Sequence, residues 1–355
     1  MRTIILVAYY FKPHKGVGVL RPSYWYDQFK KDGYNIKVLT ATPGNNDKNV
    51  IFINPSKKNL IKDNSFFWGR KCAHYIEHNL KSGKKYIIII TGGPFLQILP
   101  ILRLKNKYTN AYWIIDYRDP LSGNSRNNSD SYMAIIKQYI KQKYEYIINN
   151  MADKIITVNK ICKELLQCKD YSKVLIIDNG YDERVINNNS NNIYNTKNIV
   201  YAGKLYINNG FNQLIKALST LPDDYKFIYI GPSDIPNSSR VKSLGYLEYS
   251  DTIKHIETSE IGVILTTGDP FESTTKVFDY FGTKKKILII TQGIKFTGFL
   301  NEITKDNPNV EWANNNIENI QEALVRLQRP YVEWNYSKFS RYNGYLNLKQ
   351  IIENL

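Results

Sequence analysis

The chain has 355 residues, 43% of them apolar, and a formal net charge of +16, which predicts two globular domains of ordinary size with a basic surface. Breakers interrupt every apolar run before the length of about 18 residues that a membrane span needs, and Cys72, Cys162 and Cys168 are too scattered for a disulfide framework or a zinc site. No nucleic-acid-binding motif accompanies the positive charge, so anionic lipid and phosphorylated small molecules are the partners that it suits.

The chain opens with the pattern of a βαβ unit. Residues 3–9 form an apolar strand-like run, a loop with Gly16 and Gly18 follows, and residues 20–31 and 36–40 indicate a helix and a second strand. Glycine has no side chain, so the backbone N–H groups of such a loop can approach a ligand closely. The loop is therefore a candidate for ligand contact, although two glycines are weak evidence on their own.

A second feature of the first half is an apolar strand that ends in charged residues. The run from Trp113 to Ile115 leads directly into Asp116, Arg118 and Asp119, and a proline then stops the regular structure. In an open α/β sheet, the carboxyl ends of the strands face the ligand crevice. The same residues could form an Asp–Arg pair that only ties down a loop, but their position at a strand end leads us to favour a functional role.

Strands and helices continue to alternate along the first half, as expected for a parallel sheet covered by helices. The remaining elements predicted there are a short strand at 50–54, a helix at 66–80, a strand at 86–91, a long helix at 131–150, and strands at 153–158 and 174–177.

An Asn-rich segment at 187–197 interrupts this alternation and is the best candidate for a linker. The pattern then restarts with a strand at 198–202 that turns at Gly203 and Lys204. Two doubly wound α/β domains that face a cleft are therefore expected. The predicted parts are a first domain at 1–186, the linker at 187–197, a second domain at 198–333 and a final helical segment at 334–355.

Polar and charged residues are concentrated where a strand of the second domain leads into a short helix. Ser273, Thr274 and Thr275 are good helix N-cap residues. Lys276 follows them, flanked by the carboxylates of Glu272 and, one turn further along the helix, Asp279. A helix N-terminus at the carboxyl end of a strand is a natural place for a phosphorylated ligand. The alternative is a capped surface helix with solvated charges.

The order of these segments resembles that of GT-B fold glycosyltransferases, and in particular the large retaining family 4, also called glycosyl transferases group 1. The resemblance covers nearly the whole chain. The matching segments are residues 9–13 with Arg21, 116–120, 152–158, 201–204 and 272–280. It implies the GT-B architecture, two Rossmann-like domains with a cleft between them and a C-terminal helix that crosses back to the N-terminal domain.

The resemblance also implies roles for individual residues. The N-terminal domain would bind the acceptor, and Asp116, Arg118 and Asp119 would be the catalytic candidates. Glu272 and Asp279 are seven residues apart, whereas the family has two glutamates eight apart. Contacts with the phosphates, donor sugar, base and ribose of a nucleotide sugar are expected from Gly16, Gly18, Gly203, Lys204, Tyr246, Leu247, Glu272, Ser273, Thr274, Thr275, Lys276 and Asp279.

The function implied by the resemblance is the transfer of a hexosyl group from a nucleotide-diphosphate sugar to a saccharide or lipid-linked saccharide in bacterial surface polysaccharide synthesis, such as capsule or O-antigen assembly. A retaining reaction without metal or cofactor is expected, in the cytoplasm and in peripheral contact with the anionic inner membrane. A sugar-nucleotide epimerase of the same fold and a non-catalytic basic protein that binds membrane or nucleic acid are the alternatives.

Overall fold

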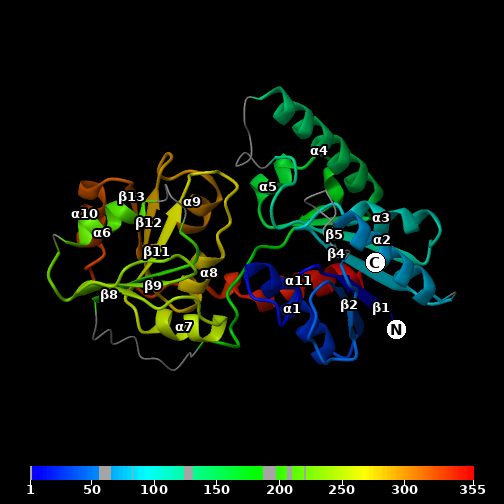
Figure 1. The fold of residues 1–355 in the computed structure, drawn as a ribbon, viewed down its shortest axis with the longest axis horizontal. Helices are drawn as coiled ribbons and strands as arrows, with labels where there is room; N and C mark the ends of the chain where they lie inside the picture. Colours follow the sequence, from blue (N-terminus) through cyan, green and yellow to red (C-terminus); the bar gives the residue numbers. More distant parts are fainter. Residues whose placement is uncertain are drawn as a thin grey trace. The chain divides into compact units, whose positions relative to one another are not determined.

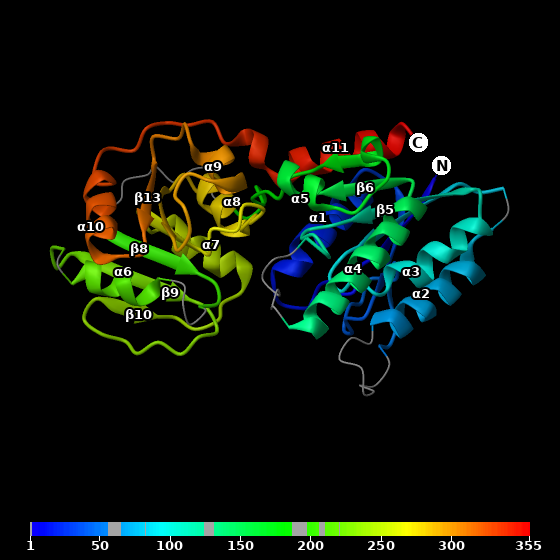
Figure 2. The same cartoon turned by 90° about the horizontal axis from the view of Figure 1, so that it is seen from above.

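The computed structural model describes residues 2–55, 65–81, 83–123, 131–186, 197–205, 210–219 and 221–355. The chain divides into two compact units, each built on a parallel sheet (Figures 1 and 2). Unit 1 comprises Met1–Asp178 and Tyr345–Leu355, and unit 2 comprises Asn179–Gly344. The boundary thus falls at Asp178, and the linker predicted at 187–197 lies outside the described residues except for Lys197.

The described part of unit 1 contains a seven-stranded sheet in the order β3-β2-β1-β4-β5-β6-β7. Its strands are β1 (Thr3–Val7), β2 (Asn35–Thr40), β3 (Val50–Phe52), β4 (Tyr86–Thr91), β5 (Ala111–Asp116), β6 (Lys154–Thr157) and β7 (Val174–Ile176). The strand order runs in opposite directions on the two sides of the β1–β4 pair. Such a switch point lets the loops at the carboxyl ends of two neighbouring strands diverge, which leaves room for a ligand there.

Helices cover both faces of this sheet because side chains alternate along its strands. Ile4 and Leu6 of β1 share one core with α1 (Val17–Lys31) and α11 (Arg341–Glu353). Ile5 and Val7 belong to the core on the other face. The helices on that face are α2 (Ser65–Asn79), α3 (Ile98–Leu102) and α4 (Tyr132–Met151), and the shorter helices of unit 1 are η1 (Arg103–Asn106), α5 (Lys160–Leu165) and η3 (Tyr171–Lys173).

The last residues of the chain, Tyr345–Leu355, belong to unit 1. The ring of Tyr345 on α11 packs edge-on against Phe29 of α1, with 4.9 Å between the ring centroids, and the Tyr345 hydroxyl donates a 2.7 Å hydrogen bond to Asp32. The helix predicted from 334 onward begins only at Arg341. Before it, the rings of Tyr336 and Phe339 pack on Phe281 of unit 2, and residues 337–339 form a separate short 3₁₀ helix.

Unit 2 has a six-stranded parallel sheet in its described part, in the order β10-β9-β8-β11-β12-β13. Its strands are β8 (Lys197–Ala202), β9 (Tyr225–Ile230), β10 (Val241–Ser243), β11 (Ile261–Thr266), β12 (Lys286–Thr291) and β13 (Val310–Asn314). β11 and β12 are buried throughout, as expected of continuous apolar runs in a parallel sheet.

The helices of unit 2 are α6 (Phe211–Leu218), α7 (Tyr249–Glu257), α8 (Thr275–Gly282), α9 (Gly298–Thr304), α10 (Ile317–Arg326) and η4 (Ser337–Phe339). α8 is locked onto the sheet by Tyr280, whose hydroxyl donates to the carbonyl of Val263 at 3.1 Å. A β-carbon at Gly262 would lie only 2.6 Å from the Tyr280 ring, so glycine is needed for this close packing. No helix among the described residues is long and apolar enough to cross a membrane.

Candidate functional site

A buried ion pair closes the carboxyl edge of the unit 1 sheet. Asp116 is the last residue of β5, and its Oδ1 lies 3.0 Å from Nη2 of Arg21 on α1. Both side chains are almost fully buried. Arg21 also donates to the carbonyls of Ile177 at 2.8 Å and Asp178 at 3.1 Å. The pair therefore ties α1 to β5 and to the end of unit 1, and Asp116 is held away from solvent.

Arg118 lies two residues beyond this pair and is enclosed by glycine loops. Its Nη2 donates to the Gly92 carbonyl at 3.3 Å, and a β-carbon at Gly18 would stand 3.3 Å from its Nη1. Its buried Nε has no hydrogen-bond partner within the described ranges of the chain. Burial lowers the pKa of the Arg118 guanidinium, against the opposing charges of Asp116 and Asp119. The predicted Gly18 and Arg118 are thus brought together, with Asp119 exposed beside them.

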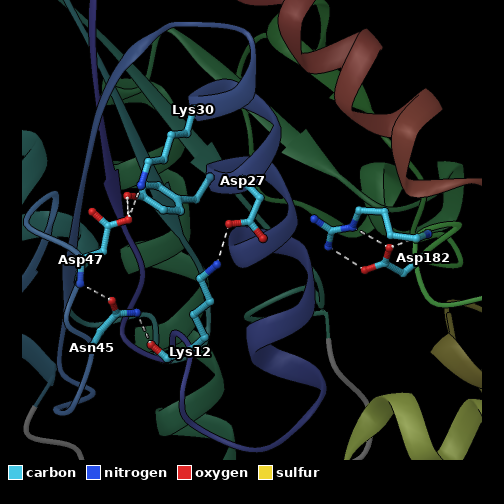
Figure 3. Close-up of polar contacts among 8 residues, drawn as sticks. Lys12, Asp27, Lys30, Asn45, Asp47 and Asp182 are labelled. Carbon is cyan, nitrogen blue, oxygen red and sulfur yellow. Dashed lines mark hydrogen bonds and ion pairs between the residues drawn. The ribbon is translucent and has the colours of Figure 1, made fainter.

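The loop between β1 and α1 makes polar contacts with α1 and with the segment after β2 (Figure 3). Lys12 forms an ion pair with Asp27 of α1 at 2.5 Å, and Asn45 donates to the Lys12 carbonyl at 2.9 Å. Gly16 is the N-cap of α1 at a positive φ of 127° and makes no side-chain cap. The helix therefore starts at Val17, before the predicted start at residue 20, and both predicted glycines lie at its N-terminus.

In unit 2, the ammonium group of Lys276 lies against the turn after β8. Lys276 is in the first turn of α8, and its Nζ stands 5.1 Å from the centroid of the Tyr201 ring. A β-carbon at Gly203 would be 2.6 Å from Lys276 Cε and 2.9 Å from Nζ, so the end of the lysine side chain would have to move, and the φ of 141° itself favours glycine. Two residues predicted independently, Gly203 and Lys276, therefore meet.

The charge of Lys276 is not balanced by a direct partner. Among the described residues, its ammonium forms no hydrogen bond or ion pair; its close contact is with the Tyr201 ring. Burial lowers the pKa of Lys276, while the charges of Glu272 and Asp279 act in the opposite direction. A partly buried cation at a helix N-terminus is disfavoured by both desolvation and the helix dipole. An anionic ligand would remove both costs.

The residues that lead into α8 make separate contacts. The Thr266 hydroxyl at the end of β11 donates to Glu272 at 2.6 Å. Asn179 donates to the Ser273 hydroxyl at 3.3 Å. Thr274 is the N-cap residue of α8 but makes no side-chain capping bond, and Thr275 begins the helix. The predicted stretch is therefore anchored at Glu272 and Ser273.

Asp279 belongs to a buried polar network. The Tyr249 hydroxyl donates to its Oδ1 at 2.6 Å. Arg341 lies 3.4 Å from the same hydroxyl and forms an ion pair with Asp182 at 3.3 Å, and Asp182 also accepts two bonds from Arg184 (Figure 3). Burial raises the pKa of Asp279 to about 6, opposed by Arg341 and by the bond from Tyr249. One carboxylate oxygen of Asp279 is therefore occupied within the protein.

The other predicted donor-binding residues lie in loops. Lys204 follows the Gly203 turn, and its carbonyl accepts from the Tyr201 hydroxyl at 3.0 Å. Tyr246 and Leu247 lie between β10 and α7, and the Tyr246 ring is half exposed, as a surface that stacks on a base needs to be. The sequence reasoning missed Tyr249, which connects this segment to Asp279.

Solved structures with the same architecture were found, although no family model and no curated protein matches the chain. Anabaena Alr3699/HepE, determined in complex with UDP and glucose, has a TM-score of 0.66 at 12% identity over 100% of both chains. The lipopolysaccharide outer core galactosyltransferase WaaB has a TM-score of 0.63 at 13% identity, covering 99% of this chain and 100% of its own. The fold is that of GT-B glycosyltransferases.

The glycosyltransferase WaaG, involved in lipopolysaccharide biosynthesis, matches in the same way, with a TM-score of 0.62 at 12% identity over 99% of this chain and 95% of its own. At these identities the similarity concerns the fold alone. The predicted α/β architecture with two Rossmann-like domains is confirmed. The family 4 subtype and the roles of the individual residues stay predictions.

Proposed function

We propose that this GT-B protein is a glycosyltransferase that moves a hexosyl group from a nucleotide-diphosphate sugar to a saccharide or lipid-linked saccharide acceptor. The observation that carries the proposal is the Lys276 ammonium beside Gly203 at the start of α8, which has no ion-pair partner in the part of the chain that the structure describes. That arrangement is suited to the diphosphate of the donor, and the similar HepE structure contains UDP. The best candidate for the donor is therefore a UDP-sugar.

The chemistry needs a stabilised leaving group more than it needs an enzymic nucleophile. Lys276 and the N-terminal N–H groups of α8 supply positive charge where the diphosphate leaves. In a retaining reaction, that phosphate accepts the proton of the acceptor hydroxyl. Exposed Asp119 serves as a base or orients the sugar. No metal or cofactor is required in this scheme.

The proposed setting is the assembly of a surface polysaccharide such as capsule or O-antigen. The similar WaaB and WaaG proteins act in lipopolysaccharide synthesis, and the basic charge of +16 suits peripheral contact with an anionic membrane. We place the enzyme in the cytoplasm at the inner face of that membrane, where a lipid-linked acceptor would be reached.

A thermal-shift screen with UDP, GDP, ADP and CDP tests the proposal first. Selective binding stabilises the folded protein by about 2.7 kcal/mol when the ligand is at 100 times its Kd. We expect UDP to raise the melting temperature of the wild-type protein and to have a smaller effect on Lys276→Met. No shift with any of the four nucleotides would contradict the proposal.

Incubation with nucleotide sugars then separates the enzyme classes. Release of nucleoside diphosphate together with a glycosylated acceptor indicates transfer. An interconverted sugar nucleotide without release indicates the epimerase alternative. Neither product, for a protein that still binds vesicles, indicates the non-catalytic basic module.

A further inference from the structure

Helix α4 of unit 1 exposes an apolar side. Eight of its large apolar side chains are between 37% and 76% exposed. They form what we call the α4 face: Tyr132, Met133, Ile135, Ile136, Tyr139, Ile140, Tyr146 and Ile147. These positions recur at helical spacing, so they form one outward stripe. In Figure 1, α4 lies at the upper edge of its unit.

The inward side of the same helix carries polar residues. Glu145 is buried and accepts a hydrogen bond from the Leu121 backbone N–H at 3.1 Å. Asn149 accepts from the Tyr117 hydroxyl at 2.8 Å and donates to the Gln167 carbonyl at 3.0 Å. The inward side of α4 therefore combines these polar residues with the buried Ile148, while most of its large apolar side chains lie on the exposed side. Rotation of the α4 face toward the core would break these buried bonds, which is costly.

The charges of α4 indicate what covers the apolar side. The helix carries Lys137, Lys141 and Lys143, and its one acidic residue, Glu145, points inward. Lysine stems can extend from an apolar face to place their ammonium groups at lipid headgroups. Tyrosine is favoured at the same depth because its ring is apolar and its hydroxyl is wet. A second copy of the chain would instead bring like charges together without acids to pair them.

We infer that the α4 face inserts into the interfacial region of an anionic phospholipid bilayer, with the helix parallel to the membrane plane. A helix of 20 residues is about 30 Å long, and an apolar face with flanking lysines is typical of interfacial helices. This inference rests on the proposed function, because an enzyme that uses a lipid-linked acceptor must reach the membrane surface.

Vesicle flotation tests the inference with two variants of matched charge. Ile135→Asp/Ile140→Asp places two acids on the α4 face, where the native side chains are 61% and 59% exposed. Val325→Asp/Val332→Asp does the same in unit 2, where they are 56% and 46% exposed. With phosphatidylglycerol–phosphatidylcholine vesicles at low salt, we expect at least a tenfold loss of partitioning for the first variant and less than a twofold loss for the second. Equal losses would overturn the inference.

Insertion depth gives a second readout that does not depend on a disruptive change. In Tyr139→Trp, the added fluorescence should be quenched by vesicles with brominated acyl chains, relative to the wild-type protein. No additional quenching would overturn the inference. Light scattering without lipid measures the oligomeric state and so tests whether a second copy of the chain binds the α4 face. A wild-type dimer that Ile135→Asp/Ile140→Asp converts to monomer would show that α4 binds a second copy instead.

The nucleotide thermal shift on the same preparations separates this inference from the proposed reaction. If Ile135→Asp/Ile140→Asp loses vesicle binding but keeps its UDP shift, α4 acts as a membrane surface on an intact protein, as expected. If the wild-type protein shifts with UDP but does not bind vesicles, the inference fails alone. If it binds vesicles through α4 without any nucleotide shift, the transferase proposal fails and the membrane surface remains.

Discussion

Asp116 in unit 1 and Asp279 in unit 2 are both buried acids with an arginine nearby, yet they are neutralised differently. Asp116 accepts directly from Arg21 at 3.0 Å. Asp279 accepts from the neutral Tyr249 hydroxyl at 2.6 Å, while Arg341 pairs with Asp182. The first acid has a fixed counter-charge. The second has none in direct contact, and burial raises its pKa to about 6.

We interpret this difference as one between a structural ion pair in unit 1 and the proposed ligand site in unit 2. In unit 1 the buried Asp116 has its counter-charge within the protein, and the exposed Asp119 is the acid that we propose acts on the substrate. In unit 2 the Lys276 ammonium has no direct counter-charge among the described residues. A positive charge without a counter-charge near a helix N-terminus is costly unless an anion binds there. The comparison predicts which side chains support the fold and which support function.

The largest expected effect is on turnover in Asp119→Asn. If Asp119 acts as base or orients the sugar, its loss should lower turnover by about 10²–10⁴-fold, with little change in nucleotide affinity. Asp306→Asn, which alters an exposed acid of unit 2, is the control. The measurement is initial rate with donor and acceptor at saturation. Turnover within about threefold of the wild-type value would assign Asp119 a structural role.

Arg21→Met should destabilise the protein most strongly, because it leaves the Asp116 carboxylate buried without a partner. We expect a loss of about 3–5 kcal/mol in the free energy of unfolding, measured by urea denaturation. Arg21→Met combined with Asp116→Leu should recover much of that loss, since an apolar pair avoids the buried charge. Arg341→Met should cost less than Arg21→Met because Asp182 keeps Arg184. Equal losses in the free energy of unfolding for the two arginine variants would contradict the difference between the two buried acids.

Much of the fold could be predicted from periodicity. The continuous apolar runs at β4, β11 and β12 are typical of strands in a parallel sheet that helices cover on both faces, and the structure buries them throughout. Helix boundaries were less predictable. α11 begins at Arg341 and not at 334, and the residues before it include the separate short helix η4 and rings that pack on Phe281. For α4 the sequence predicted a long helix at 131–150 but not which side faces outward, because that orientation depends on the partners of Glu145 and Asn149.

The site was only partly predictable. Lys276 and Gly203 were selected separately, and their contact depends on the packing of α8 over the turn after β8. Arg21, Tyr249 and Arg341 were not assigned roles. Their partners lie 95, 30 and 159 residues away in the chain, and nothing in the local pattern marks a tyrosine or arginine that pairs at such a distance.

Asp279 should make stability depend on pH. Its folded pKa of about 6 exceeds the ordinary value of 3.8, so the folded state binds the proton more tightly than the unfolded state. This contribution to stability is fully present below pH 3.8 and is lost as the pH rises through 6. The ionised carboxylate therefore costs roughly 3 kcal/mol at neutral pH.

The test compares unfolding of the wild-type protein and Asp279→Asn from pH 4.5 to pH 7.5. Because asparagine stays neutral and can still accept from Tyr249, the variant should gain stability relative to the wild-type protein as the pH rises. Asp306→Asn controls for the general change in charge. A stability difference that stays constant across this range would show that Asp279 is ionised in both states and that the two acids are alike.

Lys276→Met should have the smallest effect on the fold and a specific effect on ligand binding. Since a hydrogen bond to a charged group contributes about 1.5–3 kcal/mol, nucleoside-diphosphate affinity should fall by that amount, as it should in Asp279→Ala. The ligand-free melting temperature should stay the same or rise in Lys276→Met, because a buried cation without a direct partner is removed. Lys254→Met is the control, since it removes an equal charge from a surface pair with Asp251.

Calorimetric titration with UDP, beside melting curves of the ligand-free proteins, distinguishes the two interpretations of α8. If α8 forms a site for an anion, Lys276→Met should lower the affinity for UDP while the stability of the ligand-free protein stays the same or increases. A capped helix with solvated charges predicts the reverse, unchanged affinity together with lower stability, because any role of Lys276 would then lie in the fold. The Lys254→Met control should move neither quantity by more than about 1 kcal/mol, the upper range for an exposed ion pair. If Lys254→Met weakens UDP binding as much as Lys276→Met does, the attraction is a general effect of the basic surface. The contrast between the ion pair of unit 1 and the proposed anion site of unit 2 would then be contradicted.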